Sequence, residues 1–307
     1  MRVQLIANPV AGRNAEALIH EARQHLAHRG ARVELFLTGG RGDAEQFAAQ
    51  AVAGGFDRIV VAGGDGTVNE VVNGMGLKSP PLAILPLGTT NVLALEIGLP
   101  GAMQAVCDLA VDGVPTPIHL GLAGKRRFAL MAGVGFDAAV VRAVDLGLKR
   151  RLGKGAYLLS VCRCWLKPGN RPLTLIDEGG ASQHGYGAII SKARSYGGRF
   201  TLTPGASLFH DSLEVCLILR PGRVALLMAG LALLSGRALP APWGKQLRGR
   251  RFSVRGDRVP VQIDGDEAGF LPCDFAVNPF PIKLMLPPGR RVRKRSQDTA
   301  SALSSAC

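Results

Sequence analysis

Strand and helix signals alternate along the first hundred residues, and this alternation limits the chain to few folds. Apolar runs bounded by turn residues are separated by segments whose apolar residues recur at helical spacing. The predicted strands are VQLIANP (3–9), ARVELFLT (31–38), DRIVVAGG (57–64) and PPLAILPLG (80–88). The predicted helices cover 14–29, 43–55 and 67–76. Such alternation predicts a parallel sheet with helices on both faces.

After about Ile118 the pattern changes to short β-like segments separated by Gly, Pro, Asp and Asn. The segments lie at 126–136, 171–177, 186–193, 198–204, 212–219, 251–256, 259–265 and 282–288. They predict a mostly antiparallel β domain, interrupted by helical stretches at 149–167 and 223–236. We therefore divide the chain into an α/β domain (1–117), a β-rich domain (118–288) and a basic tail (289–307) that we expect to be disordered.

The formal net charge of +14 implies anionic partners such as nucleic acid, a membrane surface or phosphorylated ligands, although a solubilising surface explains it equally well. Six cysteines without a CxxC pair and six scattered histidines argue against a zinc site or a disulfide framework. The longest uncharged apolar run, 224–236, is shorter than the ~20 residues of a membrane-spanning helix. We expect a cytoplasmic protein whose membrane contact is peripheral.

The stretch GGDGT (63–67) joins the third predicted strand to its helix. Glycines let the backbone approach a polyphosphate, and the helix N-terminus attracts its charge. Asp65 would repel phosphate unless Mg²⁺ lies between them. A plain strand-to-helix turn is the alternative. Because ligands bind at the carboxyl ends of parallel strands, we expect the segments at 8–9, 38 and 86–91 to meet GGDGT at one site.

The longer stretch GGDGTVNEVVNG (63–74) resembles the signature of the diacylglycerol kinase catalytic-domain family, which includes sphingosine kinases and bacterial lipid kinases. ANPVAG (7–12) and LPLGTTNVLA (85–94) are similar to two further loops of that family. NAD kinases and phosphofructokinases share the shorter GGDG loop, so the resemblance implies an α/β domain of their kind. It also implies that ATP is surrounded by Asn8, Pro9, Gly12, Thr38, Gly63, Gly64, Asp65, Gly66, Thr67, Asn69, Glu70, Gly88, Thr89 and Asn91.

The resemblance continues through the second half and implies a β-sandwich there. The similar segments are 149–159, 196–206, 211–218 and 259–272. Asp211 and the backbone of Leu213 lie where bacterial members bind a structural Mg²⁺, although Ser212 replaces the usual glycine. The alternative for Asp211 is an ordinary turn residue before a strand.

The late motif of the family is Asp-Gly-Glu, and its Glu is taken as the base that removes the proton from the lipid hydroxyl. This chain has Asp-Gly-Asp at 264–266, followed by Glu267. The spacing to the following Gly and Pro puts Asp266 at the base position, with a side chain one methylene shorter. An acidic β-turn is the alternative. The resemblance thus implies two catalytic residues, Asp266 as the base and Asp65 as the residue that orients Mg²⁺.

These patterns predict an ATP- and Mg²⁺-dependent kinase that phosphorylates a hydroxyl of diacylglycerol or a related lipid. The alternatives are a small-molecule kinase like NAD kinase and, because the family Glu is missing, a non-catalytic nucleotide- or lipid-binding regulator. No nucleic-acid motif is present.

Two segments combine basic and apolar residues as interfacial helices do, 149–166 and 226–234, the second lying between Arg223 and Arg237. Packing of these helices on the β domain explains both segments equally well. The identity of the lipid and the oligomeric state, a dimer included, stay open.

Overall fold

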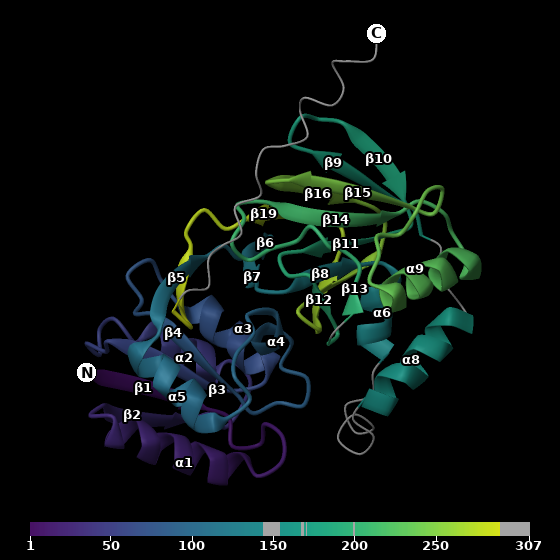
Figure 1. Ribbon diagram of the computed structural model, residues 1–307. Helices are drawn as coiled ribbons and strands as arrows, with labels where there is room; N and C mark the ends of the chain where they lie inside the picture. The colour runs from purple at the N-terminus through teal and green to yellow at the C-terminus, as the bar shows by residue number, and fades with distance from the viewer. Residues whose placement is uncertain (144–153, 167–168, 170, 199, 289–307) are drawn as a thin grey trace, which may run out of the picture.

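A mainly parallel sheet forms the centre of the first domain (Figure 1). The computed structural model describes residues 1–143, 154–166, 169, 171–198 and 200–288. Within them, the sheet has the order β2-β1-β3-β4-β20-β5. Its strands are β1 (Arg2–Ala7), β2 (Arg32–Leu37), β3 (Arg58–Gly63), β4 (Leu82–Pro86), β5 (Val114–Ile118) and β20 (Ile282–Leu286). β1 to β4 run parallel, which confirms the predicted sheet.

Helices cover both faces of this sheet. They are α1 (Ala15–His28), α2 (Asp43–Ala49), α3 (Asp65–Gly74), α4 (Val92–Glu96) and α5 (Met103–Asp112). α1 and α5 pack on the face that carries Val60, and α2 and α3 pack on the face that carries Val61. The strands are apolar on both sides because both sides are covered. The sequence analysis did not identify α4 and α5.

The second domain is inserted between β5 and β20. β20 lies beside β4 and β5, parallel to the first and antiparallel to the second. Residues 282–286 therefore belong to the first sheet, although the sequence analysis assigned them to the β-rich domain 118–288. The local signal of a strand is the same in either sheet, since only its pairing partner decides where it lies.

Two antiparallel sheets form the second domain and confirm the predicted β-sandwich. One consists of β10 (Ser182–Gly185), β9 (Leu173–Asp177), β16 (Arg251–Arg255), β19 (Cys273–Val277), β6 (Gly121–Ala123) and β7 (Arg126–Phe128). The other consists of β15 (Gly244–Gly249), β14 (Leu213–Ile218), β11 (Gly187–Ser191), β8 (Met131–Val134), β17 (Pro260–Ile263) and β18 (Asp266–Phe270). Phe128, Phe252 and Phe275 of the first sheet pack in one core with Ile190 and Val215 of the second.

Among the described residues of the second domain, three helices and a hairpin lie outside the sandwich. They are α6 (Phe136–Ala143), α8 (Lys154–Leu166), α9 (Arg223–Ser235) and the strands β12 (Ser195–Tyr196) and β13 (Phe200–Thr201). α6 packs against β17 and β8, and α9 packs against β13 and α8 (Figure 1). Of the predicted helix at 149–167 the structure describes α8, while residues 149–153 and 167, like the tail 289–307, lie outside the described residues. No described helix is long and apolar enough to cross a membrane.

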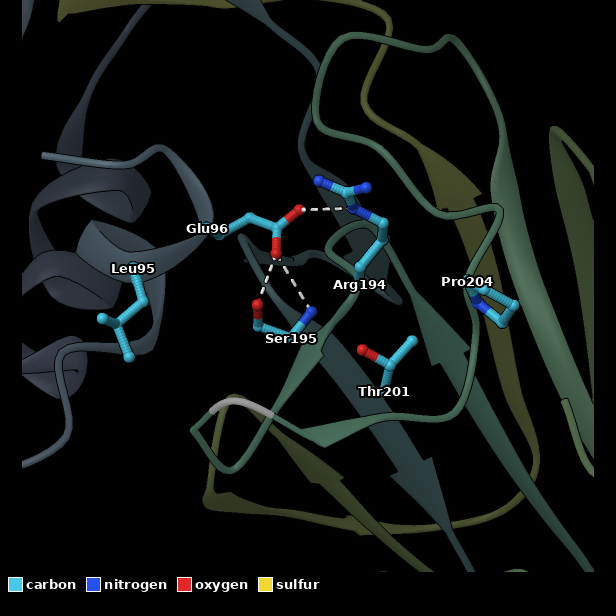
Figure 2. Close-up of a pocket in the computed structure, with 6 residues that line it drawn as sticks. All are labelled: Leu95, Glu96, Arg194, Ser195, Thr201 and Pro204. Carbon is cyan, nitrogen blue, oxygen red and sulfur yellow. Dashed lines mark hydrogen bonds and ion pairs between the residues drawn. The ribbon is translucent and has the colours of Figure 1, made fainter. Parts of the chain in front are cut away.

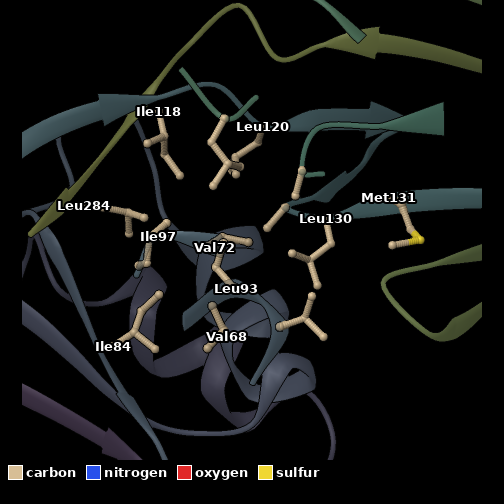
Figure 3. Close-up of a cluster of buried hydrophobic side chains, with 14 of the residues drawn as sticks. Val68, Val72, Ile84, Leu93, Ile97, Ile118, Leu120, Leu130, Met131 and Leu284 are labelled. Carbon is tan, nitrogen blue, oxygen red and sulfur yellow. The ribbon is translucent and has the colours of Figure 1, made fainter. Parts of the chain in front are cut away.

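One apolar cluster extends from the first domain into the second. Val68, Val72 and Leu93 of α3 and α4 are buried together with Leu120 and Leu130, which follow β5 (Figure 3). Dispersion contacts and burial of apolar surface therefore hold the two domains in a defined orientation. This orientation matters because the candidate site draws on both domains.

Candidate active site

The four parallel strands end level with one another. Ala7 of β1 is paired with Leu37 of β2 and Ala62 of β3, and Gly63 of β3 is paired with Pro86 of β4. The segments that follow these strands are 8–12, 38–42, 64–67 and 87–91. They lie at one edge of the sheet, and the chain changes direction across the sheet between β1 and β3. Open α/β sheets bind ligands at such a switch point.

The loops at this edge touch through their backbones. Gly12 has a φ of 87°, and an added Cβ would lie 2.2 Å from the carbonyl oxygen of Leu87. A Cβ on Gly88 would lie 2.7 Å from the Cα of Gly64. These positions therefore need glycine for close packing. Asn8, just before Pro9, donates from Nδ2 to the Thr67 hydroxyl at 3.3 Å, and the Thr38 N–H donates to the carbonyl of Ala7 at 2.9 Å.

The N-terminus of α3 is suited to an anion. Gly64 is its N-cap and offers no side-chain cap, and Gly66 in the first turn is exposed. The first N–H groups of a helix lack intrahelical partners and lie at the positive end of the helix dipole. Thr89 is exposed on the neighbouring loop. This turn can therefore bind phosphate oxygens.

Asp65 joins two of these loops. Its Oδ2 accepts the Val92 N–H at 2.9 Å and its Oδ1 accepts the Leu93 N–H at 3.1 Å. Asn91, the N-cap of α4, has no side-chain cap bond of its own, and its Nδ2 donates to the Gly88 carbonyl at 2.6 Å. The Asp65 carboxylate thus caps α4 and fixes the loop before it. Each oxygen keeps a further lone pair for another ligand.

Asp266 comes to the same edge from the second domain. Its Oδ2 lies 3.1 Å from Nη2 of Arg41, in the loop between β2 and α2. Asp43 holds that loop by accepting two glycine N–H groups. Glu267 instead pairs with Arg142 of α6 at 3.1 Å. Successive residues of a strand point to opposite sides, so Asp266, rather than Glu267, contacts the first domain.

Asp264, the first acid of the late motif, is an internal anchor. Its carboxylate is buried and accepts the N–H groups of residues 129, 130 and 131 at 2.8, 3.0 and 2.9 Å. It also accepts Nδ2 of Asn69 at 2.8 Å. Burial raises the pKa of Asp264, and these N–H donors oppose the rise. Asp264 therefore ties α3 to the second domain.

The asparagines of GGDGTVNEVVNG make a second link between the domains. Asn69 and Asn73 both donate to the Arg127 carbonyl, and Asn73 Oδ1 accepts the Arg127 N–H at 2.9 Å. The Arg127 guanidinium in turn donates to the carbonyls of Val72 and Met75 at the end of α3. The sequence analysis assigned Asn69 to the nucleotide, whereas its buried amide is engaged between the domains. Glu70, the next residue, is half-buried on α3.

A buried polar chain lies behind the Asp266 turn. Asp137 of α6 accepts Gln262 Nε2 at 2.6 Å and also accepts the Tyr196 hydroxyl. Gln262 Oε1 accepts the Gly265 N–H at 2.8 Å. Burial raises the pKa of Asp137, opposed by both donors. The chain connects the hairpin β12–β13 to the turn that precedes Asp266.

A cavity of ≈ 310 Å³ lies between α4 and this hairpin, beside the contact that Glu96 makes across them (Figure 2). Its lining residues are Leu95, Glu96, Arg194, Ser195, Thr201 and Pro204. Glu96 crosses from α4 and accepts the Ser195 N–H at 3.0 Å and its hydroxyl at 2.6 Å, and Arg194 Nε lies 3.6 Å from Glu96. The cavity is polar and open between the domains, so it can admit a hydrophilic group.

The residues around Asp211 do not fit the predicted structural Mg²⁺. Asp211 Oδ2 pairs with Arg250 at 2.9 Å. The buried Lys192 ammonium donates to the carbonyls of residues 210 and 212 at 2.5 and 3.0 Å, on either side of Asp211. Two cationic side chains thus bind the loop before Leu213, and they would repel a divalent ion. Among the described residues, no group of three or more His, Cys, Asp or Glu could hold a metal ion.

The sequence analysis missed Arg41, Arg127, Asp137 and Gln262. For the last two a signal existed, because each is a polar residue inside an apolar segment, GVGFDAAVV and VPVQI. A buried polar residue needs partners, so such positions point to an internal network. Arg41 and Arg127 carry no comparable signal in one sequence.

Comparison with known proteins identifies both halves of the chain. Residues 2–123 match the diacylglycerol kinase catalytic domain, and residues 131–286 match the YegS C-terminal NAD kinase beta sandwich-like domain. The chain belongs to the diacylglycerol kinase family. A diacylglycerol kinase of Bacillus subtilis is 28% identical over 282 residues, 89% of this chain and 92% of the relative. A probable lipid kinase YegS-like of Pseudomonas putida is 32% identical over 256 residues, 81% of this chain and 83% of the relative.

Solved structures agree with this family membership at the level of the fold. A putative diacylglycerol kinase from Bacillus anthracis superimposes with a TM-score of 0.77 at 22% identity, covering 94% of this chain and 98% of that one. An NAD kinase from Archaeoglobus fulgidus, solved in complex with ATP, gives 0.52 at 14% identity, with 94% of each chain covered. The fold is therefore that of the diacylglycerol kinases and NAD kinases, and the named relatives support a lipid kinase.

Proposed function

We propose that this protein is an ATP- and Mg²⁺-dependent kinase that transfers the γ-phosphoryl group of ATP to a hydroxyl of diacylglycerol or a related lipid. One observation carries the proposal. The uncapped N-terminus of α3 and the Asp266 carboxylate, which come from different domains, lie at the same edge of the first sheet. The first suits phosphate, and the second can accept a proton.

Nucleotide binding would rest on the loops after β1, β3 and β4. The N–H groups of residues 64–67 and the backbone at Gly88 are the proposed phosphate contacts. Mg²⁺ accompanying ATP would neutralise the phosphate oxygens. Asp65 would hold that ion directly or through water, because its oxygens keep lone pairs beyond those used for α4. Capping α4 and ligating the ion are compatible roles for this carboxylate.

Asp266 would take the proton of the lipid hydroxyl as the hydroxyl oxygen forms its bond to the γ-phosphorus and ADP leaves. Phosphoryl transfer depends mainly on positioning. An Asp reaches less far than the Glu of the family pattern, so the turn that carries it has to be well fixed. Asp264 anchors that turn, and Gln262, itself held by Asp137, binds the Gly265 N–H. This rigid support favours a working base over an idle acidic turn.

Two further candidate functions follow from particular observations. The NAD kinase-like fold favours a small-molecule kinase, and the Asp at the base position favours a regulator without turnover. The names of the relatives, diacylglycerol kinase and lipid kinase, support a lipid acceptor.

The test is phosphorylation by the purified protein with isotope-labelled ATP and Mg²⁺. Diacylglycerol and a panel of other hydroxyl lipids are offered in mixed micelles, NAD is offered in a parallel reaction, and products are identified by mass. We expect a lipid phosphate and no product from NAD. Phosphorylation of NAD alone would favour the small-molecule kinase. ATP binding without any product would favour the regulator and contradict the proposal.

A further inference from the structure

Helix α9 exposes its largest apolar side chains to solvent. Val224, Leu227, Leu231 and Leu234, here called the outer face of α9, are 51–69% exposed. Their spacing of three, four and three residues puts them on one side of the helix, over about 15 Å. No charged residue interrupts the helix after Arg223.

The opposite side of α9 packs on the protein through small residues. Ala225 and Ala232 are buried there, with Ala229 partly buried, and Met228 and Leu233 lie at the margins. A surface helix normally turns its large apolar residues to the core and polar residues to water. In α9 the order is reversed, so folding of the domain does not explain the exposed leucines. Contiguous exposed apolar surface of this kind marks an interaction site.

The end of α8 extends this surface. The Arg223 guanidinium lies over the ring of Trp165, 5.5 Å from its centroid, and donates to the Leu166 carbonyl at 2.5 Å. The Trp165 indole N–H donates to the Arg223 carbonyl at 3.4 Å. Trp165 and Leu166 themselves are exposed. Tryptophan beside leucine and arginine is the composition of an element that lies at a membrane interface.

The positive charge at the ends of the outer face indicates which kind of partner it binds. Arg220 and Arg223 at one end of α9 and Arg237 at the other are exposed. The sequence from residue 215 to residue 256 has no acidic residue. Of its basic residues, Arg248, Arg250 and Arg255 are paired with Glu214, Asp211 and Asp274, so the cations that belong to this surface are the three arginines at the ends of α9. An apolar strip with cations at both ends complements a bilayer that contains anionic lipid. A neutral protein partner would not account for cations at both ends of the strip.

We infer that the outer face of α9, with Trp165 and Leu166, is the docking surface for an anionic lipid bilayer. The inference rests on the proposed function for its purpose, because a lipid acceptor resides in a membrane. α9 packs on β13, whose Thr201 lines the cavity between the domains. Docking through α9 would thus hold this cavity between the domains close to the membrane where the substrate lies.

The experiment is co-sedimentation of the full chain with vesicles of phosphatidylcholine containing about 30% phosphatidylglycerol, without nucleotide. The variant is Leu227→Gln with Leu231→Gln. The matched control is Leu77→Gln, which changes an exposed leucine of the first domain. We expect the double variant to bind the vesicles about tenfold more weakly or worse, and Leu77→Gln to bind like the native chain. Pure phosphatidylcholine vesicles, or high salt, should also weaken binding of the native chain.

Three results would overturn the inference. The native chain could fail to bind anionic vesicles, or the double variant could bind them as well as the control. Light scattering could instead show that the double variant converts a dimer to a monomer without altering vesicle binding, which would make the outer face a contact between two copies. Failure of the proposed function can be distinguished from failure of the docking inference. If only the proposed function fails, the native chain binds anionic vesicles and the double variant binds them weakly, but no lipid is phosphorylated, including a short-chain lipid in free solution.

Discussion

Two acids of the late motif, Asp264 and Asp266, should differ strongly in how much stability the protein loses when each is replaced by Asn. In Asp264 the two carboxylate oxygens share four N–H donors, with Oδ1 accepting two and Oδ2 accepting the other two. Asp264→Asn keeps the shape of the side chain but replaces one oxygen with an NH₂ group. Two buried donors then lose their acceptor, whichever way the amide is oriented.

The size of the effect follows from these contacts. An unsatisfied buried donor costs about 1–3 kcal/mol, so two of them cost on the order of 2–6 kcal/mol. That is a large part of the roughly 5–15 kcal/mol that stabilises a typical domain. Asp266, by contrast, is 54% exposed and has one surface ion pair. Asp266→Asn should therefore change the unfolding free energy by no more than about 1 kcal/mol.

The assay is urea denaturation of both variants and the native chain, followed by circular dichroism. We expect the Asp264→Asn midpoint to fall clearly below the native one and the Asp266→Asn midpoint to stay near it. If Asp264→Asn is as stable as the native chain, or if both variants lose the same amount, the anchoring role of Asp264 is refuted. Asn69→Ala, which removes one of the four donors, should lose less than Asp264→Asn.

Three further predictions concern other groups of the site. Asp65→Asn should abolish turnover and weaken ATP binding, measured by kinetics and calorimetry, because an amide leaves one N–H of the α4 N-terminus without its acceptor. Asp137→Asn should lower kcat at least about tenfold while leaving the KM for ATP unchanged, since it repositions the Gly265 turn and not the nucleotide loops; an unaltered kcat would exclude this positioning role. Burial lowers the pKa of Lys192 to about 8, so between about pH 8 and its unfolded value of 10.5 the unfolded chain binds more protons than the folded chain. Native stability should therefore rise with pH across this window relative to Lys192→Met, as measured by thermal unfolding.

The predictions that held rest on local signals. Alternating strands and helices gave the parallel sheet because each element is encoded by the periodicity of its own residues. The glycines at 63, 64, 66 and 88 were singled out because a backbone without side chains can approach a phosphate, and their contact with a nucleotide stays a prediction. In the structure, Gly64 and Gly88 do lie against each other, since a Cβ on Gly88 would be 2.7 Å from the Cα of Gly64. Segments 8–9, 38 and 86–91 could be placed at the same edge as GGDGT because the carboxyl ends of parallel strands meet at one edge of a sheet.

The features of the fold and the site that could not be predicted depend on contacts between residues far apart in sequence. Asn69 was singled out through the resemblance of GGDGTVNEVVNG to the family signature, but its partner Asp264 lies 195 residues away in sequence. Nothing local distinguishes an amide that binds a nucleotide from one that binds another domain. Strand β20 was likewise detected but assigned to the wrong sheet. The sequence analysis did not consider Lys192 because a lysine is expected at the surface. In the structure its ammonium group is buried and donates to the backbone carbonyls of His210 and Ser212.

The most direct test of the account compares kcat with ATP affinity in Asp266→Asn. If the two domains form one active site in which Asp266 takes the hydroxyl proton, kcat for lipid phosphorylation should fall about 100-fold or more. The Kd for ATP should stay within about twofold, because the nucleotide loops belong to the first domain. Full turnover by Asp266→Asn would contradict the account, and so would an equal loss of ATP binding.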